Sequence, residues 1–248
     1  MVFILNKIRK KNTVINKLLT RDLHAHLLPN IDDGPKSMEE SLALIKGLVQ
    51  LGMKHLTATP HVFSDYYPNT KEAILQSFQQ LVEEVKKAKI EVELHCAAEY
   101  YLDDHFIELL ADNSLLPIYE NKILVETSTL ARDSNIEHYL FELQSKGFRP
   151  ILAHPERYLY FENSDFYRLK ERGCLFQINF LSLTGYYGKE ALKKVSLFLE
   201  KGYIDYIATD IHHLRHLKAI QKGLSNRKVR KILQEVNIKN GELFRNEK

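Results

Sequence analysis

Residues 21–35, RDLHAHLLPNIDDGP, contain two histidines one residue apart, His24 and His26, followed closely by Asp32 and Asp33. The histidines end a short apolar run. On a β-strand their side chains would point to the same face, because side chains alternate with a period of two. Two imidazoles directed at one spot indicate half of a metal site. An equally good interpretation of an isolated pair is one core histidine and one surface histidine, so the rest of the chain has to decide.

Seven short apolar segments alternate along the chain with helix-length segments. Such alternation implies parallel strands with right-handed crossovers, in an open sheet or a barrel. A chain of 248 residues with 44% hydrophobic content suits one large α/β domain. The first strand carries His24 and His26, and the other six are expected at residues 55–59, 91–98, 122–125, 149–153, 174–178 and 203–209. Apolar residues at helical spacing predict helices at residues 37–51, 70–88, 105–112, 136–146, 166–172, 190–201, 214–221 and 226–236.

The composition excludes several classes of protein. With a formal net charge of only +3, the composition lacks the large excess of basic residues that is typical of nucleic-acid-binding proteins. Cys96 and Cys174 lie in apolar, strand-like runs, which favours reduced, buried thiols over a disulfide framework, and neither is followed six residues later by the arginine of a Cys-x5-Arg phosphate loop. No apolar run approaches the ~20 residues of a membrane span or the roughly 7–15 of a signal-peptide core. We therefore expect a cytoplasmic protein.

Residues 1–20 are expected to form a basic extension ahead of a single domain at residues 21–248. Cations and apolar residues are interspersed in it, so the extension could form a helix that lies on an anionic membrane surface or on a partner protein. The alternative is an extension without such a role. Its cations are Lys7, Arg9, Lys10, Lys11 and Lys17.

Histidines and carboxylates recur at or just past the carboxyl ends of the expected strands. They come from six separate strands, whereas random scatter would place several of them in the middle of helices. Carboxyl ends of parallel strands converge on one rim, where the active sites of barrel folds lie. The residues are His24, His26, His61, Glu99, Glu126, His154, Asp210 and His212.

This set offers more ligands than one metal ion uses. It implies two or three ions that share a bridging carboxylate, as in hydrolases whose paired ions lie about 3.5–4 Å apart. Ligation by imidazole and carboxylate together favours manganese, iron or zinc over magnesium or calcium.

Six short motifs resemble, in order, those of the polymerase and histidinol phosphatase (PHP) superfamily. They are DLHAHLLPNIDDGP, TPH at residues 59–61, AEY at 98–100, LVET at 124–127, HPERY at 154–158 and TDIHH at 209–213. The match is closest to the metal-dependent protein-tyrosine phosphatases of bacterial capsule and exopolysaccharide loci, and it covers about residues 21–220. The resemblance implies a distorted seven-stranded (β/α)7 TIM-like barrel with a trinuclear site, often occupied by manganese.

The resemblance also implies how the ligands are shared among the ions. It selects Asp33 rather than Asp32 as a ligand, which leaves Asp32 as an N-cap or turn residue ahead of Gly34 and Pro35. The first ion would bind His24, His26, Glu99 and Asp210, the second Glu99, Glu126 and His154, and the third Asp33, His61 and His212.

The expected chemistry is phosphate ester hydrolysis. Metal ions lower the pKa of a bound water and neutralise charge on phosphoryl oxygens, and tyrosinate, whose conjugate acid has a pKa of about 10, leaves without strong acid assistance. An arginine fork should bind the phosphate. Arg157, three residues after His154, is the best placed, and Arg215, three residues after His212, is the second candidate.

Tyrosines gather in the expected rim loops and could form an aromatic cleft for a phosphotyrosine ring. These tyrosines are Tyr66, Tyr67, Tyr100, Tyr101, Tyr158, Tyr186 and Tyr187. Tyr66, Tyr100 and Tyr158 are the substrate-binding candidates among them. Amphipathic aromatic residues also line barrel rims without binding anything, which is the competing interpretation. His213 and His216 lie close enough to the motifs to remain open as site residues.

Three functions are compatible with these features. The first is hydrolysis of phosphotyrosine on a membrane-associated bacterial tyrosine kinase that controls polysaccharide export. The second is a small-molecule phosphoesterase of the same superfamily, acting on histidinol phosphate or a nucleotide. The third is an inactive binding module, against which the intact ligand set argues. About twenty residues precede the first motif, whereas the family motif usually begins within the first few, so the extension could dock the enzyme on such a kinase.

Overall fold

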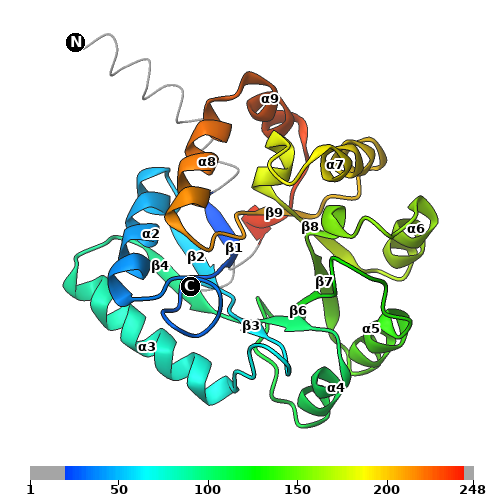
Figure 1. The fold of residues 1–248 in the computed structure, drawn as a ribbon, viewed down its shortest axis with the longest axis horizontal. Coiled ribbons are helices and arrows are strands. Elements are labelled where there is room, and N and C mark those ends of the chain that lie inside the picture. The colour runs from blue at the N-terminus through cyan, green and yellow to red at the C-terminus, as the bar shows by residue number, and fades with distance from the viewer. Residues whose placement is uncertain (1–19, 243–248) are drawn as a thin grey trace.

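The computed structural model describes residues 20–242, which form a parallel α/β fold with helices arranged around the strands (Figure 1). The predicted basic extension lies outside the described residues, apart from Thr20. The described strands are β1 (Arg21–Ala25), β2 (His55–Ala58), β3 (His61–Val62), β4 (Glu93–Cys96), β5 (Glu99–Tyr101), β6 (Lys122–Glu126), β7 (Arg149–Ala153), β8 (Leu175–Asn179) and β9 (Tyr206–Ala208).

The strands form two sheets, ordered β1-β2-β4 and β3-β5-β6-β7-β8-β9, and neighbouring strands in both are parallel. Two of the predicted strands, at residues 55–59 and 91–98, are each followed by a further short strand that was not predicted, β3 and β5. Pro60, which has no N–H to donate to a ladder, lies between β2 and β3. His61 and Glu99 were predicted just past strand ends, but they lie in the short strands β3 and β5, where they pair with each other.

Strands β1 and β9 meet at the point where the two sheets come together. Ala25 and Ile211 form an isolated parallel bridge. The Asp210 N–H donates to the carbonyl of His24 at 2.9 Å, and the His26 N–H donates to the carbonyl of Ile211 at 2.9 Å. These bonds place the opening motif beside the last one. The predicted parallel α/β fold is confirmed, while a single closed ring of seven strands goes beyond the two sheets and stays a prediction.

The predicted helices are present, with their ends displaced by a few residues. Side chains cap several of them: Ser37 accepts from Glu40 at the start of α2, and Thr70 accepts from Ala73 at the start of α3. The helices are α2 (Met38–Gln50), α3 (Lys71–Lys87), α4 (Asp104–Ala111), α5 (Ile136–Ser145), α6 (Asn163–Glu171), α7 (Lys189–Lys201), α8 (Leu214–Ser225) and α9 (Arg227–Glu235), with 3₁₀ turns η1 (Pro155–Arg157), η2 (Phe180–Thr184) and η3 (Asn240–Glu242).

The hydrophobic core has two parts because strand residues alternate between two faces. On β6, Leu124 packs into a small inner cluster, whereas Ile123 and Val125 pack into the larger cluster that includes the helices. By the same alternation, Glu126 continues the inner face beyond Leu124. The inner face is therefore apolar at its centre and changes to ligand side chains at the carboxyl ends of the strands.

Both cysteines are free, as expected, but only Cys174 is fully buried, whereas Cys96 is partly buried. Burial raises the pKa of both thiols to about 12. Within residues 20–242, no helix is long and apolar enough to cross a membrane.

Candidate metal centre and active site

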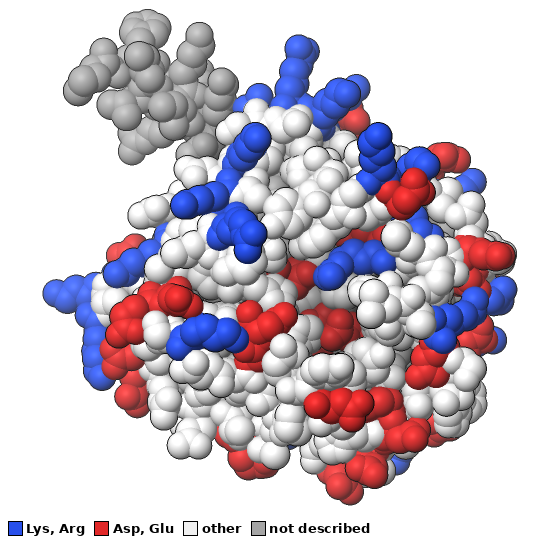
Figure 2. Space-filling view, viewed as in Figure 1, with Lys and Arg blue, Asp and Glu red and all other residues white. Residues whose placement is uncertain are grey.

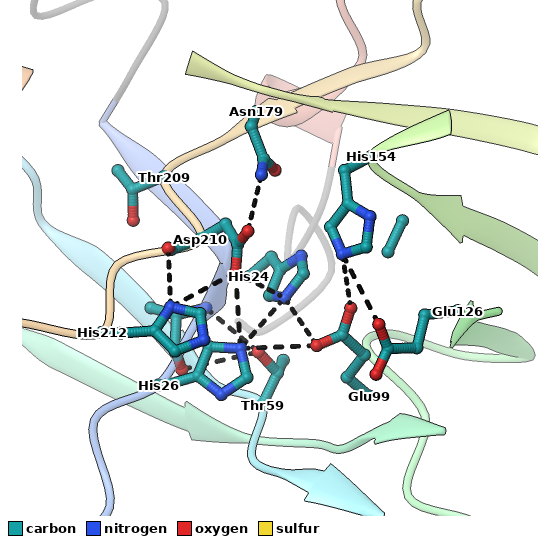
Figure 3. A network of polar contacts seen from close by, with 12 residues as sticks. His24, His26, Thr59, Glu99, Glu126, His154, Asn179, Thr209, Asp210 and His212 are labelled. Carbon is teal, nitrogen blue, oxygen red and sulfur yellow. Dashed lines mark hydrogen bonds and ion pairs between the residues drawn. The ribbon is translucent and has the colours of Figure 1, made fainter. Parts of the chain in front are cut away.

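Four buried side chains face one another at the carboxyl ends of the strands (Figure 3). The Nε2 atoms of His24 and His26 lie 3.3 Å apart. Oε2 of Glu99 lies 3.1 Å from His24 Nε2 and 3.4 Å from His26 Nε2. Oδ1 of Asp210 lies 3.4 Å and 3.5 Å from the same two nitrogens. The strand alternation that predicted two convergent imidazoles thus describes their geometry correctly.

These separations fit a shared metal ion. Ligand atoms about 2.0–2.2 Å from a tetrahedral ion lie roughly 3.3–3.6 Å from one another. Hydrogen bonding explains the arrangement less well, because two buried carboxylates converge on the same two imidazole nitrogens. The chemistry of the donor set and its spacing therefore suit a divalent metal.

A second group of ligand atoms shares Glu99 with the first. Oε1 of Glu99 lies 3.0 Å from His154 Nε2, and Glu126 Oε2 lies 3.8 Å from the same nitrogen. His61 Nδ1 lies 2.8 Å from Glu126 Oε1 and 3.2 Å from Glu99 Oε2. Glu99 thus has one oxygen in each group, as a bridging carboxylate requires.

The third group is the outermost. Oδ1 of the half-exposed Asp33 lies 3.3 Å from His212 Nε2 and 3.5 Å from His61 Nε2. The rings of His26 and His212 stack with centroids 3.9 Å apart. His61 therefore presents Nε2 to this group and Nδ1 to the second, so its ring lies between two potential ion positions.

A layer of polar residues that the sequence did not single out orients the ligands. Asp32 Oδ2 is 2.7 Å from His26 Nδ1, and Gln177 Oε1 is 2.8 Å from His24 Nδ1. Partners of this kind fix which imidazole nitrogen carries the proton and leave the other free for a metal. Asp32, expected to be a cap or turn residue, thus contacts a predicted ligand directly. The alternation LFQIN in β8 was the sequence signal that could have identified Gln177.

The Asp210 carboxylate is fixed in a similar way. Asn179 Nδ2 donates to Asp210 Oδ2 at 2.5 Å. Asp22 Oδ1 accepts from the Thr209 N–H at 3.0 Å, and Asp22 Oδ2 accepts from the Thr209 hydroxyl at 2.5 Å. This pair joins the first motif to the last. His154 and Asp210 adopt left-handed backbone conformations, with φ of 38° and 51°, which non-glycine residues adopt mainly where surrounding contacts enforce them.

Protonation reflects the same surplus of carboxylates. Burial opposes a charged His61, but Glu126 and Glu99 outweigh it and raise the pKa of His61 to about 9. Burial likewise opposes a charged His24, yet Glu99 and Asp210 raise its pKa. Burial also disfavours an ionised Glu99, but His24 and His61 hold its pKa well below the usual range. Metal ions would have to displace these protons, so metal affinity should rise with pH.

The ligands lie at the bottom of a cleft of about 700 Å³. Its walls are largely aromatic: Phe63 stacks on Tyr101 at 3.9 Å between centroids, and Tyr67 stacks on His61 at 5.4 Å. Tyr66 also lines the cleft, as predicted, and is 72% exposed. Tyr67, Tyr101 and Tyr187, which belong to the rim tyrosines predicted to form such a cleft, also line it, although they were not chosen as substrate-binding candidates.

The structure places the other two tyrosine candidates in the core. Tyr100 is buried, and its hydroxyl accepts from the Leu116 N–H at 2.7 Å. Tyr158 is fully buried, and its hydroxyl donates to the Ala153 carbonyl at 2.9 Å. These side chains support the rim from behind, because strand alternation turns Tyr100 away from the face that carries Glu99.

The two arginine candidates differ in position. Arg157 lines the cleft, with Nη1 3.4 Å from Asp210 Oδ2 and its guanidinium 4.9 Å from the Tyr187 ring centroid. Burial disfavours its charge, but Asp210 outweighs this and raises the pKa of Arg157. Arg215 is exposed on α8 and does not line the cleft. His213 and His216, which the sequence left open, both line it.

A further set of potential ligands, His55, Glu93 and His95, lies at the opposite ends of β2 and β4. Glu93 contacts His55 Nδ1 at 2.8 Å and His95 Nε2 at 3.1 Å. None of the three lines the cleft.

A parallel α/β fold that gathers imidazoles and carboxylates at the carboxyl ends of its strands has the arrangement of a metal-dependent hydrolase. The sequence model of the family described as capsular polysaccharide synthesis, CpsB/CapC, matches residues 20–243, and the chain belongs to this family.

Known proteins of this group are similar over most of the chain. CapC of Staphylococcus aureus is 31% identical over 229 residues, which cover 90% of this chain and 89% of CapC. The tyrosine-protein phosphatase YwqE of Bacillus subtilis is 32% identical over 198 residues, 78% of each chain. A structure from the crystallographic study of YwqE and Streptococcus pneumoniae CpsB, described as unique metal-dependent tyrosine phosphatases, superposes with a TM-score of 0.77 at 27% identity, covering 92% of this chain and 95% of that one.

Proposed function

We propose that this protein is a metal-dependent tyrosine phosphatase that hydrolyses phosphotyrosine on a protein substrate. The observation that carries the proposal is the cage of His24, His26, Glu99 and Asp210, with ligand atoms 3.1–3.5 Å apart. The cage lies beneath a cleft with aromatic walls. The tyrosine-protein phosphatases among its relatives support the same activity.

The proposed ligand assignment follows the three groups of side chains, with His61, which contacts both the second and the third group, given to the third. Glu99 would bridge the first and second ions. Bound ions would supply a water of lowered pKa and positive charge for the phosphoryl oxygens. We propose manganese, with iron or zinc as alternatives, because the donors are imidazoles and carboxylates without a thiolate. The first ion would bind His24, His26, Glu99 and Asp210, the second Glu99, Glu126 and His154, and the third Asp33, His61 and His212.

Arg157 is the proposed phosphate-binding residue. Its guanidinium lies at the cleft wall, held between Asp210 and the Tyr187 ring. Asp210 uses only part of the fork, so donors remain that could bind two phosphoryl oxygens at once. The aromatic walls at Tyr67 and Tyr101 would then receive the ring of the leaving tyrosine.

Three finer statements belong to the same proposal. The two sheets would act as one distorted seven-stranded barrel, supported by the parallel bridge between Ala25 of β1 and Ile211, just past β9. The substrate would be a membrane-associated tyrosine kinase of capsule or exopolysaccharide synthesis, supported by the family description. A cytoplasmic location is supported by the two free cysteines.

The test compares substrates and variants under the same metal conditions. Protein treated with a chelator should lose activity, and added manganese should restore turnover of a phosphotyrosine peptide but not of histidinol phosphate. His24→Ala and His154→Ala should reduce that turnover by at least about a hundredfold while the thermal unfolding curve remains cooperative. His138→Ala, on the exposed face of α5, is the matched control. Wild-type activity in either ligand variant would refute the metal assignment, and preferred turnover of histidinol phosphate would refute the substrate class.

A further inference from the structure

Residues 211–234 contain seven lysines and arginines and no aspartate or glutamate. The net charge of the whole chain is only +3, so the remainder is net negative. This segment comprises α8 and most of α9. Figure 2 shows blue Lys and Arg side chains over this part of the surface, on the same face as the hollowed centre with its red carboxylates. A strong positive charge therefore lies beside an acidic cleft.

Three of these cations form a line along α8, which we call the α8 stripe: Arg215, Lys218 and Lys222. Their spacing of three and four residues places them on one side of the helix. The opposite side is fixed in the core by the buried Ile220 and Leu224. All three cations of the stripe are exposed.

The α8 stripe is not balanced by neighbouring acids. Some helical lysines elsewhere pair within their own helix, as Lys87 does with Glu84 and Lys193 with Glu190. Among residues 20–242, no acidic residue forms an ion pair with any cation of the stripe. An ordinary solvated helix face carries charges of both signs, and this face carries one sign only.

The stripe starts at the mouth of the cleft. His212, His213 and His216 line the cleft, and α8 begins at Leu214 between them. Seven residues of helix, at about 1.5 Å each, separate Arg215 from Lys222 by roughly 10 Å. An extended peptide covers that length with about three residues. A chain whose phosphotyrosine enters the cleft could therefore lie along the stripe with its neighbouring residues.

We propose that the α8 stripe is a docking site for negatively charged groups that flank the phosphotyrosine in the substrate chain. The groups could be acidic side chains or additional phosphates, which share the chemistry that lysine and arginine recognise. This inference rests on the proposed phosphatase function. It adds a substrate preference for phosphotyrosine chains with anionic flanks.

A peptide explains the arrangement better than a membrane surface does. A lipid surface needs a broad patch facing one plane, whereas the stripe is one side chain wide and leads away from the cleft. Lipid binding is therefore treated as an opposing outcome.

The test uses the manganese-loaded full chain, three phosphotyrosine peptides and a small aryl phosphate. The peptides carry neutral flanks, glutamate flanks or a second phosphotyrosine. The variant is Lys218→Glu with Lys222→Glu, which leaves the proposed catalytic residues intact. The matched control, Lys86→Glu with Lys87→Glu, makes the same charge change in the last turn of α3.

The stripe variant should raise KM for the two anionic peptides about two- to tenfold, as expected for two exposed ion pairs, with kcat unchanged. The neutral peptide and the aryl phosphate should be unaffected, and the difference should shrink in about 1 M salt. The relative effect on the two anionic peptides identifies carboxylate or phosphate as the preferred group.

The docking site would be refuted if the stripe variant changed KM equally for all peptides, or did not change KM for any of them. Either result would leave the phosphatase function intact. Loss of binding to phosphatidylserine vesicles without any change in peptide kinetics would assign the stripe to a membrane and overturn it as well. Absence of activity on every phosphotyrosine substrate would instead refute the proposed function, and the docking site with it.

Discussion

Replacing Asp32 by asparagine should weaken metal binding, although Asp32 is not a proposed ligand. Both of its oxygens accept hydrogen bonds from separate donors. Oδ2 accepts from His26 Nδ1 at 2.7 Å and from the His61 N–H at 3.2 Å, while Oδ1 accepts from the Gly34 N–H at 2.9 Å. Asp32 therefore keeps the proton of His26 on Nδ1 and directs Nε2 toward the cage.

The size of the effect follows from these bonds. An asparagine has one carbonyl oxygen, so its NH₂ group must face either the His26 and His61 donors or the Gly34 donor. A buried donor left without an acceptor costs about 1–3 kcal/mol. Loss of a carboxylate that orients a metal-bound histidine typically lowers affinity or activity about 10- to 100-fold, which is roughly 1.4–2.7 kcal/mol. The two estimates agree.

The measurement is a manganese titration of chelator-treated protein, with turnover of a phosphotyrosine peptide as a second readout. Asp32→Asn should shift the metal dissociation constant upward by about 10- to 100-fold. Asp112→Asn, which removes the same charge from an exposed position at the end of α4, is the control. An unchanged dissociation constant and unchanged turnover would show that Asp32 does not orient His26.

Three further predictions concern the same site. In Gly34→Ala, the added Cβ would lie 2.9 Å from Asp32 Oδ1 and 3.0 Å from His26 Cβ. Manganese affinity should therefore fall in the same titration. An unchanged affinity would mean that the loop adjusts without moving His26. Arg157→Lys should lower kcat/KM for a phosphotyrosine peptide about tenfold or more, because a point charge replaces the planar guanidinium. The metal content, measured by elemental analysis, should not change. Wild-type kinetics would show that Arg157 does not bind the phosphate. Burial raises the pKa of Asp22 from 3.8 to about 6, so its stabilising contribution is complete below about pH 4 and is lost as pH rises through 6. The free energy of unfolding of the chelated wild-type protein, measured with urea, should therefore fall by up to about 3 kcal/mol more than that of Asp22→Asn between pH 4 and pH 7. Parallel pH profiles of the two proteins would contradict this.

Local sequence was sufficient to predict features that depend on one chain segment alone, such as the face of a strand to which a side chain points. The period of two predicts that His24 and His26 converge, and their Nε2 atoms lie 3.3 Å apart. The alternation of apolar strands with amphipathic helices predicts the parallel α/β fold. It also places Glu126 and His154 at strand ends, because a strand must turn polar where it leaves the core.

Residues that act through partners distant in the sequence could not be identified in this way. Gln177 is 153 residues from His24, and only the ladder of strands brings the two together. Tyr100 and Tyr101 are neighbours of similar chemistry, yet one lies in the core and the other lines the cleft. The break between β4 and β5 sets that register, and no local pattern reveals it.

The sequence by itself determined the fold class, the family and the identity of the candidate ligands, because these depend on local periodicity and on short motifs in a fixed order. Only the tertiary structure decided that Asp32 orients His26, that Gln177 contacts His24 and that the cations of α8 lie beside the cleft. Such roles depend on distances between strands and helices far apart in the chain. Those distances are set by packing and backbone hydrogen bonds across the whole domain.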